Sequence, residues 1–131
     1  MSDARWISWC WTLGLALLAL IHLAPVLGVA GADALQKLYG IGAEGPDLQL
    51  LLRHRAVLFG MAGGIMLLAL FHPCYRGIAL AVGWLNVISF IVLAAQTGQI
   101  NEALTRVLWV DYFALLPLTG LSALLLFGPR Q

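Results

Sequence analysis

Four stretches of the sequence are each long and apolar enough to cross a lipid bilayer as a single α-helix. They run from about residue 6 to 28, 47 to 72, 75 to 97 and 102 to 127. A bilayer core about 30 Å thick requires about 20 mostly apolar residues per spanning helix. Apolar residues occupy nearly every face of each stretch, which fits lipid surroundings better than water. The sequence therefore predicts an all-α integral membrane protein, with residues 1–131 forming one four-helix antiparallel transmembrane bundle.

The composition excludes other classes of protein. The chain has 131 residues, of which 62% are hydrophobic and 10% are charged, whereas a soluble domain carries about 25% charged residues. Its net charge of +1 and scattered basic residues provide no basic stripe for nucleic acid. Cys10 and Cys74 form no disulfide framework. Together with His72 they show no spacing typical of a metal site, so we predict no bound metal.

Capping and breaking residues indicate the helix ends. Asp47 is expected to cap the second helix, which stops at Pro73. Asn101 is expected to cap the fourth, which Pro117 should bend. The links near Pro73 and over residues 98–101 are short, so the helices on either side of each should be antiparallel neighbours.

The longer segment between the first and second spans contains a short amphipathic stretch at residues 32–39. With helical spacing, Leu35, Leu38 and Tyr39 share one face and the polar residues share the other. We predict that this segment forms a short helix whose apolar face lies towards the membrane and covers a polar pocket.

Basic residues outside the helices indicate the orientation. Arg5, Arg76 and Arg130 lie on the side of both termini, whereas Lys37 is the loop residue on the other side. Because Lys and Arg accumulate in cytoplasmic loops, both termini are predicted to be cytoplasmic. The bias is small, so a dual topology stays open as an alternative.

Polar residues recur at a similar depth in all four predicted helices. Ionisable groups in a membrane are costly and usually face a partner or a wet cavity. We predict a polar pocket in the half of the bundle away from the termini, which is the outer half in this topology. Its candidate ligand-binding residues are His22, Arg53, His54, Arg55, Asn86, Arg106 and Asp111. The alternative is a buried ion-pair network that holds the helices together.

Asp111 is expected to be the acidic centre of this pocket, with Arg55 as its main partner. Both lie about 12–15 Å along helices that start from the same side of the membrane. Arg106 precedes Asp111 by five residues on one helix and is expected to point away from it.

Small residues in the second span allow a neighbouring backbone to come close. Gly60 and Gly64 have the G-x-x-x-G spacing that is typical of such contacts. The contact could be made within the chain or with a second copy of it.

The segment L-L-R-H-R-A-V-L-F-G at residues 51–60, together with four short spans, resembles uncharacterised, broadly DoxX-like four-helix membrane proteins of bacteria. The resemblance implies a location in the bacterial inner membrane and a quinone-linked or redox-accessory role. It transfers no catalytic residue. Some relatives carry the label phosphopantetheine adenylyltransferase, a soluble α/β enzyme whose H-x-G-H motif this chain lacks.

Three functions fit these observations. The leading hypothesis is a binding or accessory protein whose pocket holds a quinone, a lipid head group or a membrane-protein partner. The second is an enzyme acting on a lipid or quinone, with Asp111 and either His22 or His54 as its acid–base pair. The third is a small homo-oligomeric transporter or channel that associates through Gly60 and Gly64.

Overall fold

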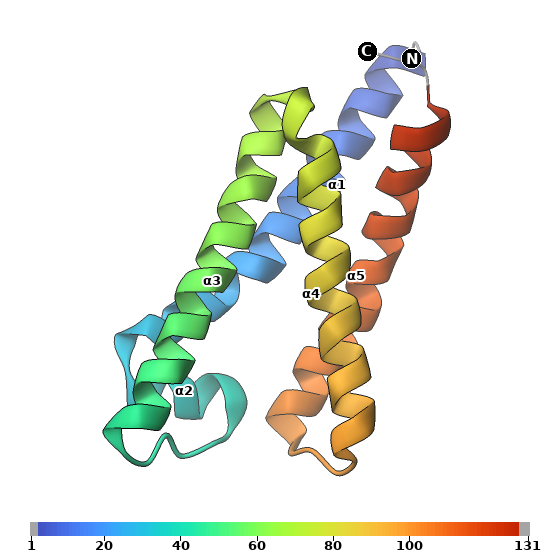
Figure 1. Ribbon diagram of the computed structural model, residues 1–131. Coiled ribbons are helices and arrows are strands. Elements are labelled where there is room, and N and C mark those ends of the chain that lie inside the picture. The colour runs from blue at the N-terminus through green and yellow to red at the C-terminus, as the bar shows by residue number, and fades with distance from the viewer. Residues whose placement is uncertain (1–2, 129–131) are drawn as a thin grey trace.

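The computed structural model describes residues 3–128, and all the secondary structure in that range is helical. Four long helices and one short helix are joined by two 3₁₀ turns. In chain order they are α1 (Asp3–Leu23), η1 (Ala24–Ala30), α2 (Ala32–Tyr39), α3 (Pro46–Phe71), η2 (Pro73–Tyr75), α4 (Arg76–Thr97) and α5 (Glu102–Phe127) (Figure 1). The predicted fold class is confirmed: a four-helix bundle with a short helix between its first and second long helices.

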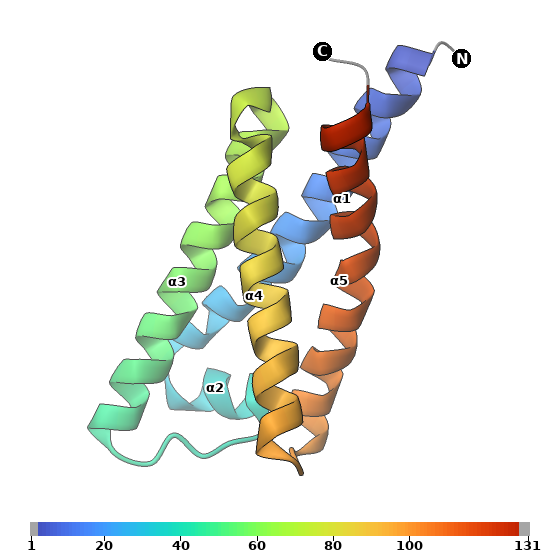
Figure 2. The same ribbon diagram turned by 45° about the vertical axis from the view of Figure 1, so that its right-hand side comes forward.

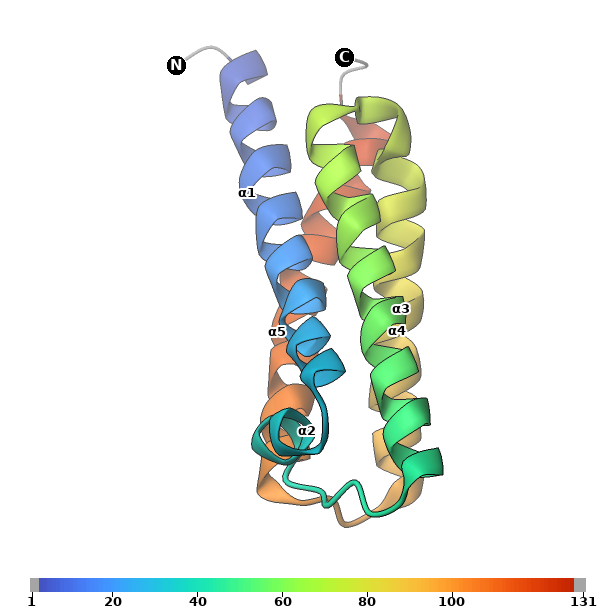
Figure 3. The same ribbon diagram turned by 90° about the vertical axis from the view of Figure 1, so that its left-hand side faces the viewer.

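The four long helices form a closed ring. α1 packs against α3 and α5, and α4 also packs against α3 and α5. α3 and α5 therefore lie on opposite sides of the ring, as Figures 1 and 2 show. The turn between α3 and α4 lies at the same end as α1's start and α5's end, here called the termini end. α2 crosses the other end, here called the α2 end (Figure 3).

All four long helices are long and apolar enough to cross a membrane. Their outer surface is rich in large apolar side chains such as Leu85, which is 72% exposed, and Leu116, which is 67% exposed. Because such a surface is stable in lipid rather than in water, the chain is a small multi-pass membrane protein.

The first span departs from a single α-helix at its end. α1 stops at Leu23, and Ala24–Ala30 carries the first span past the expected residue 28 as a 3₁₀ helix. Pro25 is the cause, because its ring disfavours the α conformation at Ala24 and it has no N–H to donate.

The start of α3 corrects a second expectation. Gly45 precedes the helix, Pro46 is its first residue, and no side chain caps it. The prediction that Asp47 is the cap is wrong: Asp47 lies in the first turn. Proline is favoured at the first helical position because its φ is already helical and its missing N–H would have no partner there.

The cap at α5 is confirmed and has a second role. The Asn101 side-chain oxygen accepts a hydrogen bond from the Leu104 N–H at 2.8 Å. Its amide nitrogen donates to the Tyr39 carbonyl oxygen at 2.9 Å. One side chain therefore starts α5 and also holds the end of α2.

The predicted short helix forms, but its apolar face points inward. Leu35 and Tyr39 are buried together with Ala43 in a small core beneath α2, rather than facing the membrane. This small core lies at the α2 end. The main core fills the ring further towards the termini end, with Leu15 and Leu118 fully buried in it.

Glycines bring α3 close to α1 and η1. A Cβ built on Gly63 would lie 2.6 Å from Leu23 Cγ, and one on Gly60 would lie 3.2 Å from a Val26 methyl carbon. Gly64 has no neighbour within 4 Å. The close approach within the chain therefore uses Gly60 and Gly63. Of the predicted pair Gly60 and Gly64, only Gly60 lies at this contact.

At the termini end, the Arg76 guanidinium lies over the Trp11 ring, 4.4 Å from its centroid. This contact joins the starts of α1 and α4 by a cation–π interaction. Arg130, one of the basic residues on which the predicted orientation depends, lies outside the described residues.

Candidate functional site

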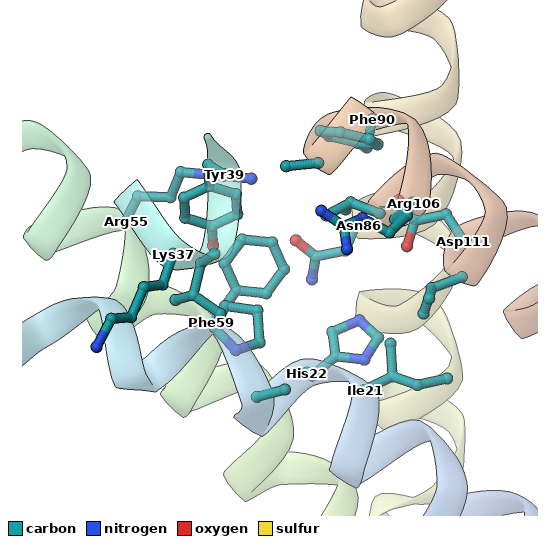
Figure 4. Close-up of a pocket in the computed structure, with 16 residues that line it drawn as sticks. Ile21, His22, Lys37, Tyr39, Arg55, Phe59, Asn86, Phe90, Arg106 and Asp111 are labelled. Atoms are coloured by element: carbon teal, nitrogen blue, oxygen red, sulfur yellow. The ribbon is translucent and has the colours of Figure 1, made fainter. Parts of the chain in front are cut away.

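A cavity of about 310 Å³ lies inside the ring near the α2 end. Side chains from all four long helices and from α2 line it (Figure 4). Most of its wall is apolar, with the aromatic rings of Phe59 and Phe90 among the lining groups. An apolar cavity with a few polar groups directed into it is the usual form of a small-molecule site.

Five of the seven predicted site residues line this one cavity: His22, Arg55, Asn86, Arg106 and Asp111. Arg53 and His54 do not. The Arg53 Nε donates to the Val29 carbonyl oxygen at 2.9 Å, and His54 is exposed. Successive helical residues are turned by about 100°, so three consecutive side chains cannot all face the same cavity.

Arg55 is held by aromatic rings. Its guanidinium carbon lies 5.0 Å from the centroid of the Tyr39 ring and 5.1 Å from that of Phe59. Such cation–π contacts stabilise the cation without neutralising it. Among residues 3–128, no ion pair joins Arg55 to a carboxylate, so the expected pair with Asp111 does not form. α3 and α5 lie on opposite sides of the ring, and Arg55 and Asp111 line the same cavity from these two sides, where the charge of Arg55 still acts on Asp111.

The α5 side of the cavity carries Arg106 and Asp111 (Figure 4). Both side chains line the same cavity, but among the described residues no ion pair joins them. The charge that acts on Asp111 is that of Arg55, which agrees with the expectation that Arg106 is the poorer partner. Lys37 from α2 also contributes to the wall, but its amino group points away from the centre in Figure 4. The charges directed at the cavity are thus two guanidinium groups and one carboxylate.

His22 is 2% exposed and lies at the inner side of the cavity. Its Nδ1 lies 2.8 Å from the Leu18 carbonyl oxygen. A carbonyl oxygen can only accept, so Nδ1 carries the hydrogen, and Nε2 of the neutral ring is an acceptor. The His22 ring also packs against Phe59, with centroids 6.1 Å apart. The cavity therefore holds a fixed acceptor opposite its guanidinium donors.

A second cavity, of about 210 Å³, adjoins the first between α3 and α4. The two share Arg55, Phe59, Asn86 and Phe90 in their walls. Leu58 on α3 and Leu93 on α4 lie only in the second.

Sequence reasoning missed the aromatic part of the wall. Phe59 follows Arg55 by four residues, and Phe90 follows Asn86 by four. Residues four apart lie on the same helical face, so this spacing was a usable signal. Tyr39 was assigned to the membrane surface, whereas its ring faces Arg55.

Tyr39 belongs to α2, outside the spanning helices. Burial raises the pKa of the Tyr39 phenol above its ordinary value, and the nearby positive charge of Arg55 partly opposes that shift. The phenol is therefore neutral at physiological pH.

The fold and the cavity define a class: a small multi-pass membrane protein whose helices surround, at one end of the bundle, a mainly apolar cavity with a few charged and polar groups. Comparison of the chain with protein-family models, curated proteins and solved structures finds no match. The DoxX-like resemblance stays a prediction based on residues 51–60.

Proposed function

We propose that the protein is an inner-membrane binding or accessory protein whose cavity holds the polar head of an amphipathic membrane molecule. The observation that carries this proposal is the convergence of His22, Arg55, Asn86, Arg106 and Asp111 on one cavity. The cavity volume of about 310 Å³ is at the lower end of the range for small-molecule sites.

The energetic cost of these residues favours a ligand over a purely structural role. Each charged side chain deep in a membrane helix costs about 3 kcal/mol on insertion scales. This cost applies to Arg55 and Asp111, whereas Arg106 is exposed near the start of α5. A structural network would offset this cost with ion pairs. Within the part of the chain that the structure describes, neither Arg55 nor Arg106 is ion-paired with Asp111. A ligand that supplies the missing counter-charge and hydrogen-bond partners therefore explains these charges better than a structural network does.

The proposed topology gives the ligand its location. With both termini in the cytoplasm, the α2 end and its cavity lie in the outer half of the bilayer. A quinone ring could lie against Phe59 and Phe90, and a lipid head group could reach the arginines; both belong to the proposed ligand class.

Mass spectrometry of the intact protein released from detergent tests this function. We expect the purified protein to carry a lipid or quinone that is reduced in Arg55→Gln and retained in Arg53→Gln. Arg53 is a matched control because it lies two residues away and outside the cavity. Equal retention by both variants, or a parent protein that carries no amphiphile, would contradict the proposal.

One observation favours the enzyme hypothesis as a second candidate: His22 and Asp111 line the same cavity. They could act as acceptor and donor for a proton of a bound lipid or quinol. The test is incubation of the purified protein with these compounds and mass analysis of the products. Turnover should be lost in Asp111→Asn while ligand is still bound; the absence of any product with the parent protein rejects this candidate.

A further inference from the structure

The cavity between α3 and α4 connects the polar site with the lipid-facing surface. Leu58 and Leu93 in its wall are 49% and 59% exposed, so they face the hydrocarbon of the membrane. Arg55 and Asn86, also in this wall, line the main cavity as well. A molecule can therefore occupy both spaces, with one part inside the ring and the other in lipid.

The arrangement of the helices explains why the opening is here. α3 and α4 are joined at the termini end and diverge towards the α2 end (Figures 1 and 2). Elsewhere in the ring, glycines bring α3 against α1, and the Trp84 indole donates to the Ser122 hydroxyl at 3.0 Å between α4 and α5. A hydrocarbon chain would therefore pass from the cavity into the lipid between α3 and α4, and we call this opening the lateral exit.

The charge of the site selects the kind of head group. Two guanidinium groups and one carboxylate give the cavity an excess of one positive charge when Asp111 is ionised. A neutral quinone would leave this excess positive charge without a counter-charge in the cavity. A phosphate neutralises it, and guanidinium groups bind phosphate with paired, charge-assisted hydrogen bonds.

The hydrogen-bond acceptors in the site indicate which groups the head carries besides its phosphate. His22 Nε2, in the neutral ring, accepts hydrogen bonds, and so does the Asp111 carboxylate. Head-group hydroxyls can donate to both, whereas a quaternary ammonium has no hydrogen to donate.

We propose that the ligand is an anionic phospholipid with a hydroxyl-bearing head. Its phosphate lies between Arg55 and Arg106, its hydroxyls face His22 and Asp111, and a hydrocarbon chain leaves between α3 and α4. This inference rests on the proposed function and specifies the ligand of that site.

Competition binding in detergent, read by mass spectrometry of the intact protein, tests the head group. The probes are phosphatidylglycerol, phosphatidylcholine and a short-tailed ubiquinone. We expect phosphatidylglycerol to be preferred, with an affinity about tenfold lower in Arg55→Gln and in Arg106→Gln, since a charge-assisted contact of this kind is worth at least one factor of ten. Arg53→Gln should bind like the parent.

The lateral exit is tested by filling it. Ser89 lies in the wall of the second cavity and is exposed, so Ser89→Trp should block the groove without disturbing the core. We expect it to weaken long-chain phosphatidylglycerol about tenfold, leaving the dihexanoyl form unchanged. Leu85→Trp is the control, because Leu85 is exposed one helical turn from Ser89 and lines neither cavity.

The outcomes separate this inference from the proposed function. Tighter binding of ubiquinone or phosphatidylcholine by the parent would refute the anionic head and leave an amphiphile-binding protein. Equal effects of Ser89→Trp on both chain lengths, or none on either, would refute the lateral exit. Binding of none of the three probes would reject the inference and the proposed function together.

Discussion

We predict that Asn101 controls access to the cavity through α2, and that this role can be separated from its role as a helix cap. Its side-chain oxygen accepts from the Leu104 N–H at 2.8 Å, and its amide nitrogen donates to the Tyr39 carbonyl oxygen at 2.9 Å. An N-cap contributes about 1 kcal/mol to the free energy of unfolding. The hydrogen bond to Tyr39 contributes about another 1 kcal/mol.

Two substitutions remove these bonds in different combinations. Asn101→Ala loses both, so its free energy of unfolding should fall by about 2 kcal/mol. Asn101→Asp keeps an oxygen acceptor at the helix start, where negative charge is favourable, but it loses the donor to Tyr39. Its free energy of unfolding should fall by about 1 kcal/mol or less. Both variants release α2 and should open the cavity to the same extent.

A water-soluble maleimide measures that opening. Val107 lines the cavity and is replaced by Cys in a background where Cys10 and Cys74, the free cysteines in the structure, are Ser. We expect Asn101→Ala and Asn101→Asp both to be labelled faster than the parent. Thermal unfolding in detergent should nevertheless show that Asn101→Ala is the less stable of the two.

Thr105→Val is the control for this experiment. The Thr105 hydroxyl donates to the Asn101 carbonyl oxygen at 2.9 Å, in the same turn but without contact to α2, so labelling should not change. If Asn101→Asp labels at the parental rate while Asn101→Ala labels faster, the cap rather than the bond to Tyr39 holds α2. If neither variant labels faster, Asn101 does not control access.

Three further predictions follow from the packing, from the buried phenol and from the proposed topology. Gly63→Ala should lower the free energy of unfolding by about 1–3 kcal/mol because its Cβ would meet Leu23. Gly64→Ala should raise the free energy of unfolding by up to about 1 kcal/mol. Thermal melts that rank the two variants in the opposite order would contradict this packing. Because the pKa of the Tyr39 phenol is raised in the folded protein, the unfolded chain loses this proton at a lower pH, and stability should fall as pH rises above about 10. Thermal melts recorded at alkaline pH should show a smaller fall in stability for Tyr39→Phe. A reporter fused after Gln131 should be active in the cytoplasm, and activity on the opposite side would reverse the proposed orientation.

The sequence predicted the helices and the depth of the polar groups, because both depend on spacing along one chain. Hydropathy located the spans, helical periodicity located α2, and Asn101 was identified as a cap from its type and position. Depth along each helix brought His22, Asn86 and Asp111 to the same region.

The sequence could not give the order of the helices around the ring or the rotation of each one. The order places α3 opposite α5, so Arg55 and Asp111 line the cavity from opposite sides, and the guanidinium of Arg55 lies over the Tyr39 and Phe59 rings. The rotation of α3 turns Arg55 inward and Arg53 and His54 outward. The start of α3 was missed for a local reason: Asp47 is a good capping residue by type, but Pro46 already occupies the first helical position.

The main core gives the cavity a closed floor. Leu15, Leu18, Met66 and Leu118 are each fully buried and come from three helices of the ring, where they fill its centre on the side of the termini. Towards the termini end, the cavity meets this apolar plug. Permeation through a single copy would require these side chains to separate. The cavity is therefore closed on the side of the termini by the packed core of the bundle.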